Sequence, residues 1–299
     1  MSNFIYKLTI IIPTYNTGIY LNNALNSISN QQLNKNLIQV LVVDDGSIDN
    51  TRAIVQTHQD KNYLNIQYIY KENKNWGSVI NYVKKNRLAK GEYVTILDAD
   101  DWYLPKAFNF FNKLNTSYDL IISDFKKKTS LRTIRIFTYS YFLKAPKNLR
   151  QAQTPFCIPL GKFVSNDLFY KLPDLKENTF YQDALFTAHV INNAKKIFHI
   201  NKALGVYNYR RIGNSMSLPW SDKRYWSEID ICLELLKIDA QEIVAIHIMR
   251  NKFRKLLKEN FYTFIVSRKF NFKFFPWYTR WIVYIIYLTT LKKYFIFQN

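Results

Sequence analysis

Acidic side chains stand at two points in the chain where an apolar run gives way to a polar loop. Asp44 and Asp45 end the apolar part of VLVVDDGS, and Asp98, Asp100 and Asp101 lie in VTILDADDW. Oxygen-only groups of this kind suit Mg²⁺ or Mn²⁺ rather than Zn²⁺, and grouped negative charges are destabilising unless a cation joins them. The residue types therefore predict a divalent cation that holds a phosphorylated substrate.

A parallel sheet would bring both groups of acids together. The runs 40–43 and 93–97 are short and rich in β-branched residues, which is typical of strands buried on both faces. The carboxyl ends of parallel strands share one edge of the sheet, and ligands bind at that edge in open α/β folds. We therefore expect the two groups of acids to meet there.

Strand and helix patterns alternate from residue 7 to about residue 125, which indicates a βαβ architecture. Leu21, Leu25 and Ile28 recur at helical spacing, so the first helix has one apolar face. Asp49 is predicted to cap the second helix, and Pro105 to open a helix over 106–114. The predicted strands are 8–12, 40–43, 66–70, 93–97 and 120–123, with a further helix over 78–88.

The second half of the chain has a less regular pattern. Residues 132–137, 197–200 and 204–209 are strand-like, 183–193 is helical, and the chain beyond Trp220 is mostly helical. The chain has 299 residues, of which 48% are hydrophobic, and this is enough for a sizeable core. No internal repeat or low-complexity linker occurs, so we expect the second half to pack directly on the first.

The C-terminal segment is both basic and aromatic. The net charge of the chain is +20, and residues 240–299 carry eleven Lys or Arg against two Glu. The apolar run WIVYIIYL at 281–288 is shorter than the roughly 20 residues that span a bilayer. Three interpretations stay open: an anchor in the membrane interface, helices packed on the rest of the protein, and single-stranded nucleic-acid binding, the last of which leaves the acidic loops unexplained.

The cysteine count and the first residues bear on location. Only Cys157 and Cys232 are present, without CxxC spacing, so a reducing compartment fits best. The apolar run at the start ends at Pro13, and we expect a first strand there rather than a signal peptide. The sequence thus predicts a cytoplasmic protein, peripheral at the cytoplasmic face of the membrane if the C-terminal segment docks there.

Four ordered segments resemble the family 2 glycosyltransferases of the GT-A fold: TIIIPTYN, VLVVDDGSIDNT, ENKNWGSVIN and GEYVTILDADDWYLP. The similarity is close over about residues 7–110, and it recurs more weakly in YQDALF and in YNYRRIGNSMS at 207–217. The resemblance implies a Rossmann-like mixed sheet with helices on both faces. It also implies an inverting enzyme that uses a nucleotide-diphospho-sugar, with uracil as the expected base.

The resemblance implies a role for each matching residue. Tyr15 would supply a stacking ring, and Asp45 would contact the nucleoside. Asp98 would bind ribose or metal-bound water, and Asp100 would ligate the metal directly with help from Asp101. The implied nucleotide-sugar contacts are Pro13, Thr14, Tyr15, Asn16, Asp45, Ser78, Asp98, Ala99, Arg210 and Arg211.

These motifs also have structural explanations. The DDGS segment can form a local turn in which Gly46 has a positive φ. Asp101 can cap a following helix, and Asp98 can accept hydrogen bonds from loop amides. Arg210 and Arg211 make either bidentate contacts with the diphosphate or a solvated pair. For the acidic motifs, four motifs in the right order favour binding over these explanations, whereas the two interpretations of the arginine pair stay equally open.

An acceptor hydroxyl must lose its proton as it attacks, so the reaction needs a general base. Asp183 is the candidate, although Gln182 stands where the family usually has Glu. The equally weighted alternative is an Asp near a helix N-terminus, where the helix dipole favours it.

The sequence predicts a catalytic domain over 1–218 and a helical, basic and aromatic region over 219–299. The nucleotide-sugar part covers about 1–125 and the acceptor part about 126–218. The predicted function is transfer of a sugar to a glycan or lipid-linked glycan in surface polysaccharide or glycoconjugate synthesis. The alternative is an inactive nucleotide-sugar-binding or membrane-scaffold protein of the same fold.

Overall fold

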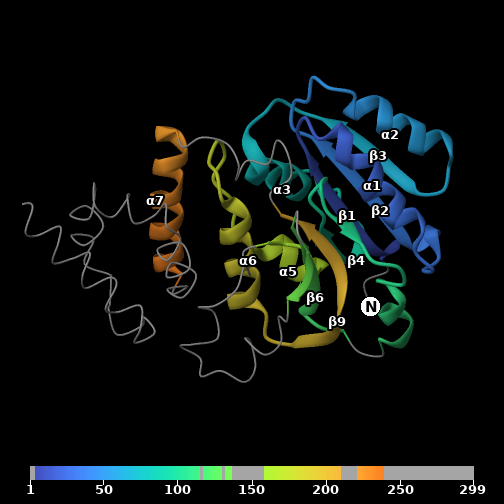
Figure 1. The fold of residues 1–299 in the computed structure, drawn as a ribbon. Coiled ribbons are helices and arrows are strands. Elements are labelled where there is room, and N and C mark those ends of the chain that lie inside the picture. Colours follow the sequence, from blue (N-terminus) through green and yellow to red (C-terminus); the bar gives the residue numbers. More distant parts are fainter. Residues whose placement is uncertain (1–3, 115–116, 130–131, 137–157, 210–220, 239–299) are drawn as a thin grey trace, which may run out of the picture.

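The structure is a computed structural model, and it describes residues 4–114, 117–129, 132–136, 158–209 and 221–238. Within these ranges, one nine-stranded sheet has the order β3-β2-β1-β4-β8-β6-β9-β5, with β7 paired to β6 off this path. Figure 1 shows helices on both sides of this sheet. The predicted α/β class with a mixed sheet is confirmed.

Parallel strands form the first half of the sheet, and the second half is mixed. β1 pairs in parallel with β2 and β4, and β2 with β3. β8 is antiparallel to both β4 and β6, so β4 and β6 point the same way, and β9 is parallel to β6. The strands are β1 Tyr6–Thr14, β2 Ile38–Asp44, β3 Asn65–Tyr70, β4 Gly91–Ile96, β5 Trp102–Tyr103, β6 Leu120–Lys128, β7 Thr133–Ile136, β8 Lys162–Ser165 and β9 Ile197–Asn208.

Two apolar clusters hold the helices to opposite faces of the sheet. α1 and α2 contribute to one cluster, and α3, α5, α6 and α7 contribute to the other. α7 packs against α6 rather than on the sheet, as Figure 1 shows at the left of the molecule. The helices are α1 Gly18–Ser29, α2 Thr51–Asp60, α3 Asn75–Lys85, α5 Asn166–Lys171, α6 Gln182–Asn193 and α7 Asp222–Lys237, and the 3₁₀ helices are η1 Lys35–Leu37 and η2 Asn109–Lys113.

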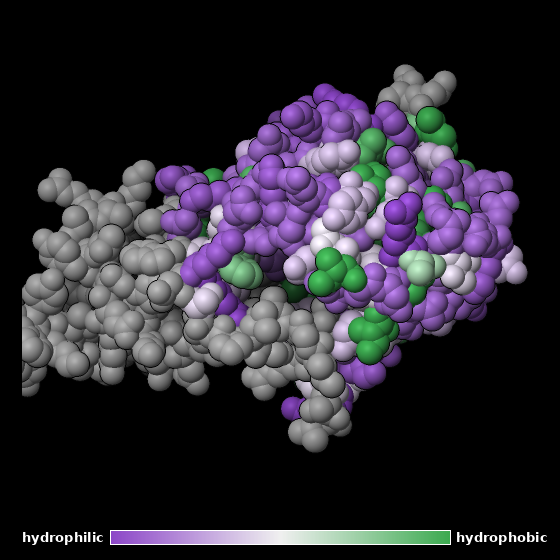
Figure 2. All heavy atoms as spheres, turned by 90° about the horizontal axis from the view of Figure 1, so that it is seen from above, coloured by the Kyte–Doolittle hydropathy of each residue, from purple (hydrophilic) through white to green (hydrophobic). Residues whose placement is uncertain are grey.

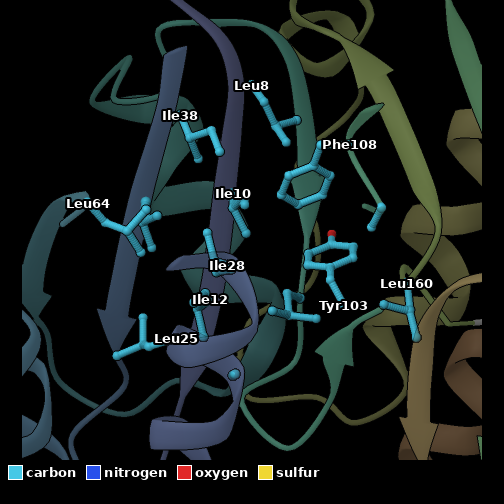
Figure 3. Close-up of a cluster of buried hydrophobic side chains, with 14 of the residues drawn as sticks. Leu8, Ile10, Ile12, Leu25, Ile28, Ile38, Leu64, Tyr103, Phe108 and Leu160 are labelled. Atoms are coloured by element: carbon cyan, nitrogen blue, oxygen red, sulfur yellow. The ribbon is translucent and has the colours of Figure 1, made fainter. Parts of the chain in front are cut away.

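Alternation along β1 explains the continuous apolar run at residues 10–12 in this strand. Ile10 and Ile12 face α1, whereas Ile11 belongs to the cluster on the other face. Figure 3 shows Ile10 and Ile12 beside Leu25 and Ile28 of α1, and all of these side chains are fully buried. Successive side chains of a strand point to opposite faces, so only a strand covered on both faces is apolar at every position.

Two local predictions were wrong. Residues 106–114 do not form an α-helix: Lys106 has φ +62, which ends regular helix there, and only the 3₁₀ helix η2 follows. The N-cap of α2 is Asn50 rather than Asp49. The Asp49 carboxylate nevertheless accepts hydrogen bonds from the Thr51 N–H at 3.1 Å and the Gly18 N–H at 2.9 Å, so it joins the starts of α2 and α1.

The C-terminal segment and the predicted domain boundary at residue 218 lie outside the ranges that the structure describes. Residues 239–299 include the predicted membrane anchor. No helix within the described ranges is long and apolar enough to cross a bilayer. Figure 2 shows a mainly hydrophilic surface on which apolar patches are separate from one another.

Candidate active site

The two groups of acids lie at one edge of the sheet, as predicted. β1, β2 and β4 are parallel neighbours, so their carboxyl ends share this edge. Asp45 follows β2, and its N–H donates to the Thr14 carbonyl at the end of β1 over 2.8 Å. On the other side of β1, the Leu97 N–H donates to the Ile11 carbonyl, and the DADD loop begins directly after Leu97.

The neighbouring acids Asp44 and Asp45 have different roles. Asp44 is buried, and its carboxylate accepts from the Ser47 N–H at 2.8 Å and from the Tyr68 hydroxyl at 2.7 Å. Gly46 has φ +87, so the predicted turn is present. Asp44 therefore serves the turn, whereas Asp45 makes its contacts elsewhere.

Lys71 holds Asp45, and the sequence reasoning missed it. The Lys71 ammonium lies 2.5 Å from Asp45 Oδ1 and donates to Ser78 Oγ at 2.8 Å. The two side chains are only 11% and 5% exposed, so this is a largely buried ion pair. Lys71 directly follows β3, a third parallel strand, so the rule that located the acids would have located this lysine too.

The β1–α1 loop presents an exposed ring directly after Thr14, whose carbonyl bonds to the Asp45 N–H. Pro13 and Thr14 are buried, but Tyr15 is 52% exposed. Asn16 has φ +48 and fixes the loop: its N–H donates to Ser47 Oγ at 2.8 Å, and its side-chain carbonyl accepts from the N–H of residue 48 at 2.9 Å. These bonds tie the first two loops of the edge together and leave a ring face available for stacking.

The DADD loop is held from two sides. Asp98 Oδ1 accepts from the Trp76 indole N–H at 2.9 Å, and Asp101 Oδ1 accepts from the Asn208 N–H at 2.8 Å. Asp98 and Asp100 are partly exposed, whereas Ala99 and Asp101 are buried. Asp101 caps no helix, because the short strand β5 follows it. The alternative structural explanation of Asp101 is therefore wrong.

The start of α3 connects Asp45 to the DADD loop. Asp45 accepts from the Lys74 N–H at 3.1 Å, and two residues later the Trp76 indole reaches Asp98. Ser78 Oγ lies 3.4 Å from Asp45 and accepts a hydrogen bond from Lys71, so it lies beside the acid that follows β2. One turn of helix thus contacts both groups of acids.

The same turn of α3 packs against the start of α6, which carries Asp183. The Trp76 ring meets the Phe186 ring edge-on at 6.0 Å. A Cβ on Gly77 would lie 3.1 Å from Gln182 Cγ and 3.0 Å from the Lys176 carbonyl, so a larger residue would push these neighbours by a few tenths of an ångström. Asp183 stands in the first turn of α6, where the helix dipole favours it.

The Tyr207 phenol is subject to the charges of acids from both the DADD loop and α6. Burial raises the pKa of the Tyr207 phenol well above its ordinary value, and the charges of Asp101, Asp183, Asp98 and Asp100 raise it further. The phenol of Tyr207 is therefore protonated near neutral pH, and the charges of both the DADD loop and Asp183 act on it. The sequence indicated this tyrosine only as the first residue of the segment 207–217, which resembles the family.

The acids fit a cation that a substrate also binds. Within the described ranges, no group of three His, Cys, Asp or Glu side chains is arranged as a ready-made metal site. Mg²⁺ sites, however, usually take one or two carboxylates together with substrate phosphates. Asp98 and Asp100 offer carboxylate oxygens at the edge of the sheet, which suits such a shared site. Arg210 and Arg211 lie outside the described residues.

Comparisons with known proteins agree with this geometry. Residues 9–172 match the model of the family described as glycosyl transferase family 2. An uncharacterized glycosyltransferase of Mycoplasma pneumoniae is 47% identical over 295 residues, covering 98% of this chain and 99% of that protein. The Mycoplasma genitalium counterpart is 47% identical over 292 residues, covering 97% of this chain and 98% of that protein.

A solved structure gives the same result at the level of the fold. The crystal structure of TarS from Staphylococcus aureus in complex with UDP-GlcNAc has a TM-score of 0.64 at 26% identity, and the match covers 85% of this chain and 76% of that chain. In sequence, TarS, a poly(ribitol-phosphate) β-N-acetylglucosaminyltransferase, is 28% identical over 253 residues, 79% of this chain and 42% of that protein. With its acids gathered at one sheet edge, and with a family match over more than half its length, this chain belongs to glycosyltransferase family 2 and has the GT-A fold.

Proposed function

We propose that this protein transfers a sugar from a UDP-sugar to an acceptor hydroxyl, with inversion at the anomeric carbon. One observation carries the proposal: the first turn of α3 contacts Asp45, bonds to Asp98 and packs against the start of α6, next to Asp183. Three groups are thereby neighbours: Asp45, which would contact the nucleobase, Asp98, which would lie near the diphosphate, and Asp183, the candidate general base. The UDP-GlcNAc complex of TarS supports a uridine nucleotide as the donor.

The donor would lie along the edge formed by β1, β2 and β4. The exposed ring of Tyr15 offers a stacking face for the base, and Asp45 offers an acceptor for a base N–H. Lys71 holds the Asp45 carboxylate in one orientation, so that little side-chain entropy remains to be lost on binding. The diphosphate would then extend toward Asp98 and Asp100.

Transfer is a single displacement in this proposal. The acceptor oxygen bonds to the anomeric carbon while the bond from that carbon to the diphosphate oxygen breaks, and the acceptor proton passes to Asp183. Asp98, Asp100 and Asp101 would hold Mg²⁺ or Mn²⁺, which stabilises the negative charge on the departing diphosphate. Tyr207 remains protonated near neutral pH and offers a hydrogen-bond donor among the acids.

Thermal-shift and transfer assays test this proposal. The full chain is titrated with UDP-GlcNAc, UDP-glucose and GDP-mannose, with Mn²⁺ or with EDTA, because a ligand of the folded state raises Tm by mass action. We expect a UDP-sugar to raise Tm more with Mn²⁺ than with EDTA. The Asp100→Asn variant should lose this metal dependence and most transfer activity, whereas Asp60→Asn, an exposed change on α2, should keep both. Full activity in Asp100→Asn would reject the metal assignment.

The acceptor belongs, in this proposal, to a surface polysaccharide or glycoconjugate made at the cytoplasmic face of a membrane. The support is the basic and aromatic composition of residues 240–299, which suits anionic headgroups and the lipid boundary. Sedimentation of the full chain with vesicles of phosphatidylglycerol or of phosphatidylcholine checks the location. Equal recovery in the supernatant with both lipids would contradict it.

A further inference from the structure

Lysines and aromatic rings alternate at one edge of the second half of the sheet. Lys126, Lys127 and Lys128 end β6. The Lys127 ammonium lies 3.6 Å from the centroid of the Tyr209 ring, and the Lys128 ammonium lies 5.3 Å from that of Trp102. We call these five residues the basic aromatic edge. Among the described residues, none of its three lysines forms an ion pair with a carboxylate, so their charge is available to a ligand.

The sheet register places this edge beside the acids. β6 points the same way as β4, so the carboxyl ends of both strands lie at one side of the sheet. Lys128 pairs with Asn208, whose N–H donates to Asp101, and Trp102 directly follows Asp101 in the chain. Adjacent strands lie about 4.8 Å apart, so the lysine backbone stands roughly 5 to 10 Å from the DADD loop.

The same topology separates the basic aromatic edge from the part of the proposed donor site that would hold the nucleobase. Asp45 and Lys71 follow β2 and β3, while β8 intervenes between β4 and β6. A substrate in contact with these lysines therefore approaches the acids of the DADD loop from the side opposite the nucleobase of the donor. In a transfer reaction that side belongs to the acceptor.

The chemistry of the edge indicates which acceptor. An ammonium above a ring keeps three N–H donors, and lysine binds phosphate as a point charge. Aromatic faces such as those of Trp102 and Tyr209 offer flat apolar surface to the carbon skeleton of a polyol or sugar. On the basis of the proposed function, we propose that the basic aromatic edge binds an acceptor that carries phosphate groups, and that it holds the phosphate next to the hydroxyl that attacks.

The test compares acceptors that differ in phosphate. Transfer from the best UDP-sugar is measured to a ribitol-phosphate oligomer, to ribitol alone, and to vesicles that contain phosphatidylglycerol. We expect the wild type to prefer a phosphate-bearing acceptor. In the double variant Lys127→Gln and Lys128→Gln, the KM for that acceptor should rise roughly 5- to 30-fold, as expected for two partly exposed charge contacts. The KM for the donor should stay unchanged.

The chain offers a matched control at the opposite end of the same pair of strands. Lys196, just before β9, lies 4.9 Å from the centroid of the Tyr118 ring, so Lys196→Gln removes one lysine charge and one ring contact of the same kind far from the acids. This variant should transfer like the wild type. Both variants should keep the wild-type Tm, because all of these changes are at exposed or half-exposed positions.

Each outcome of this test either supports or overturns the proposal. Activity on the oligomer but not on vesicles identifies a soluble polyol phosphate, and the reverse identifies a lipid headgroup; both support the proposal. Equal use of ribitol and its phosphate oligomer overturns it, and so does a rise in the donor KM in the double variant, since the lysines would then serve the donor. Absence of transfer to every acceptor, with UDP-sugar binding intact, would refute the proposed function itself.

Discussion

The two halves of the sheet place their functional groups by different means. In the first half, β1 to β4 are parallel and joined by helices, so the ends of the strands alone bring Tyr15, Asp45 and the DADD loop to one edge. In the second half, the strands are mixed in direction, and Asp183 is positioned by α6, which packs on α3. The proposed donor side is therefore built by the sheet, and the proposed acceptor side by a contact between helices.

The lysines of the two halves also have different roles. Lys71 is buried against Asp45, so its charge is used to fix a protein group. The lysines at the end of β6 are exposed or half-exposed, and within the described ranges they have no carboxylate partner. A paired buried charge contributes orientation, whereas an exposed charge contributes attraction to a ligand. In the proposed function, the donor half is thus arranged before binding, and the acceptor half relies more on its substrate.

The largest expected effect comes from the acceptor side. Asp183→Asn removes the candidate base while keeping the size of the side chain, so transfer should fall about 10²- to 10⁴-fold. The donor edge is built separately, so the Tm rise with UDP-sugar and Mn²⁺ should persist. The first turn of α5 offers a control, since Asp167 is an exposed acid at the same helical position. Equal losses in Asp167→Asn and Asp183→Asn would contradict a role for Asp183 as base.

The second prediction concerns the buried pair of the donor side. Lys71→Met leaves the Asp45 carboxylate buried without its cation, which costs about 3 kcal/mol and lowers Tm by roughly 6 to 12 °C. Nucleotide affinity should fall with it, because Asp45 loses its fixed orientation. In the second half, Lys237→Met breaks an exposed pair with Glu234, and its Tm should change by less than about 4 °C. Similar Tm values for both variants would refute the contrast between the halves.

The difference between the halves also explains how far the sequence could be interpreted. The strands of the first half were predicted because each is apolar on both faces and followed by an amphipathic helix, and these are local signals. Asp45 and Asp98 were placed at one edge by the same reasoning. The helix expected after Pro105 failed because nothing local announces the positive φ of Lys106.

The second half depended on contacts that the sequence does not display. β8 pairs antiparallel between β4 and β6, and β5 has only two residues, so neither has enough length for a periodic pattern. The nearness of Tyr207 to Asp101 follows from pairing between strands about a hundred residues apart. The approach of α6 to Gly77 is equally non-local. The sequence indicated Asp183 only through resemblance, because its neighbours come from α3 and β9.

The third prediction targets the contact that joins the halves. Gly77→Ala would place a methyl group 3.0 Å from the Lys176 carbonyl and 3.1 Å from Gln182 Cγ, so α3 or the groups packed against it must move by a few tenths of an ångström. Transfer should fall roughly tenfold, because small misplacements of a catalytic group are costly. Tm should change little, since alanine is about 1 kcal/mol better than glycine within a helix and offsets the crowding.

Substrate kinetics decide which side of this contact moves. A rise in the KM of the acceptor, with UDP-sugar affinity unchanged, would mean that α6 moves and that the donor edge is the rigid part. A loss of UDP-sugar affinity with an unchanged acceptor KM would mean that α3 moves instead. The second outcome would break the distinction between a donor half that is arranged in advance and an acceptor half that is not.

The smallest expected effect is on acid stability, and it tests whether the halves unfold together. In the second half, burial lowers the pKa of His199 despite Asp124, which lies 3.3 Å away and raises it; Arg135 lowers it further. In the first half, burial and then Lys61 lower the pKa of His58. Each histidine is therefore protonated more readily in the unfolded chain, so the free energy of unfolding falls as pH decreases through about 6.5.

Denaturant unfolding of the wild type, His58→Gln and His199→Gln between about pH 7.5 and about pH 5.5 measures this dependence. A chain that unfolds in one step should show one transition, and both variants should reduce its sensitivity to acid. If the halves unfold separately, two transitions should appear, and each variant should change only one of them. The first result is expected because β4 and β8 belong to one sheet, and α3 and α6 share one apolar cluster. The second would mean that the contact at Gly77 alone couples the donor side to the acceptor side.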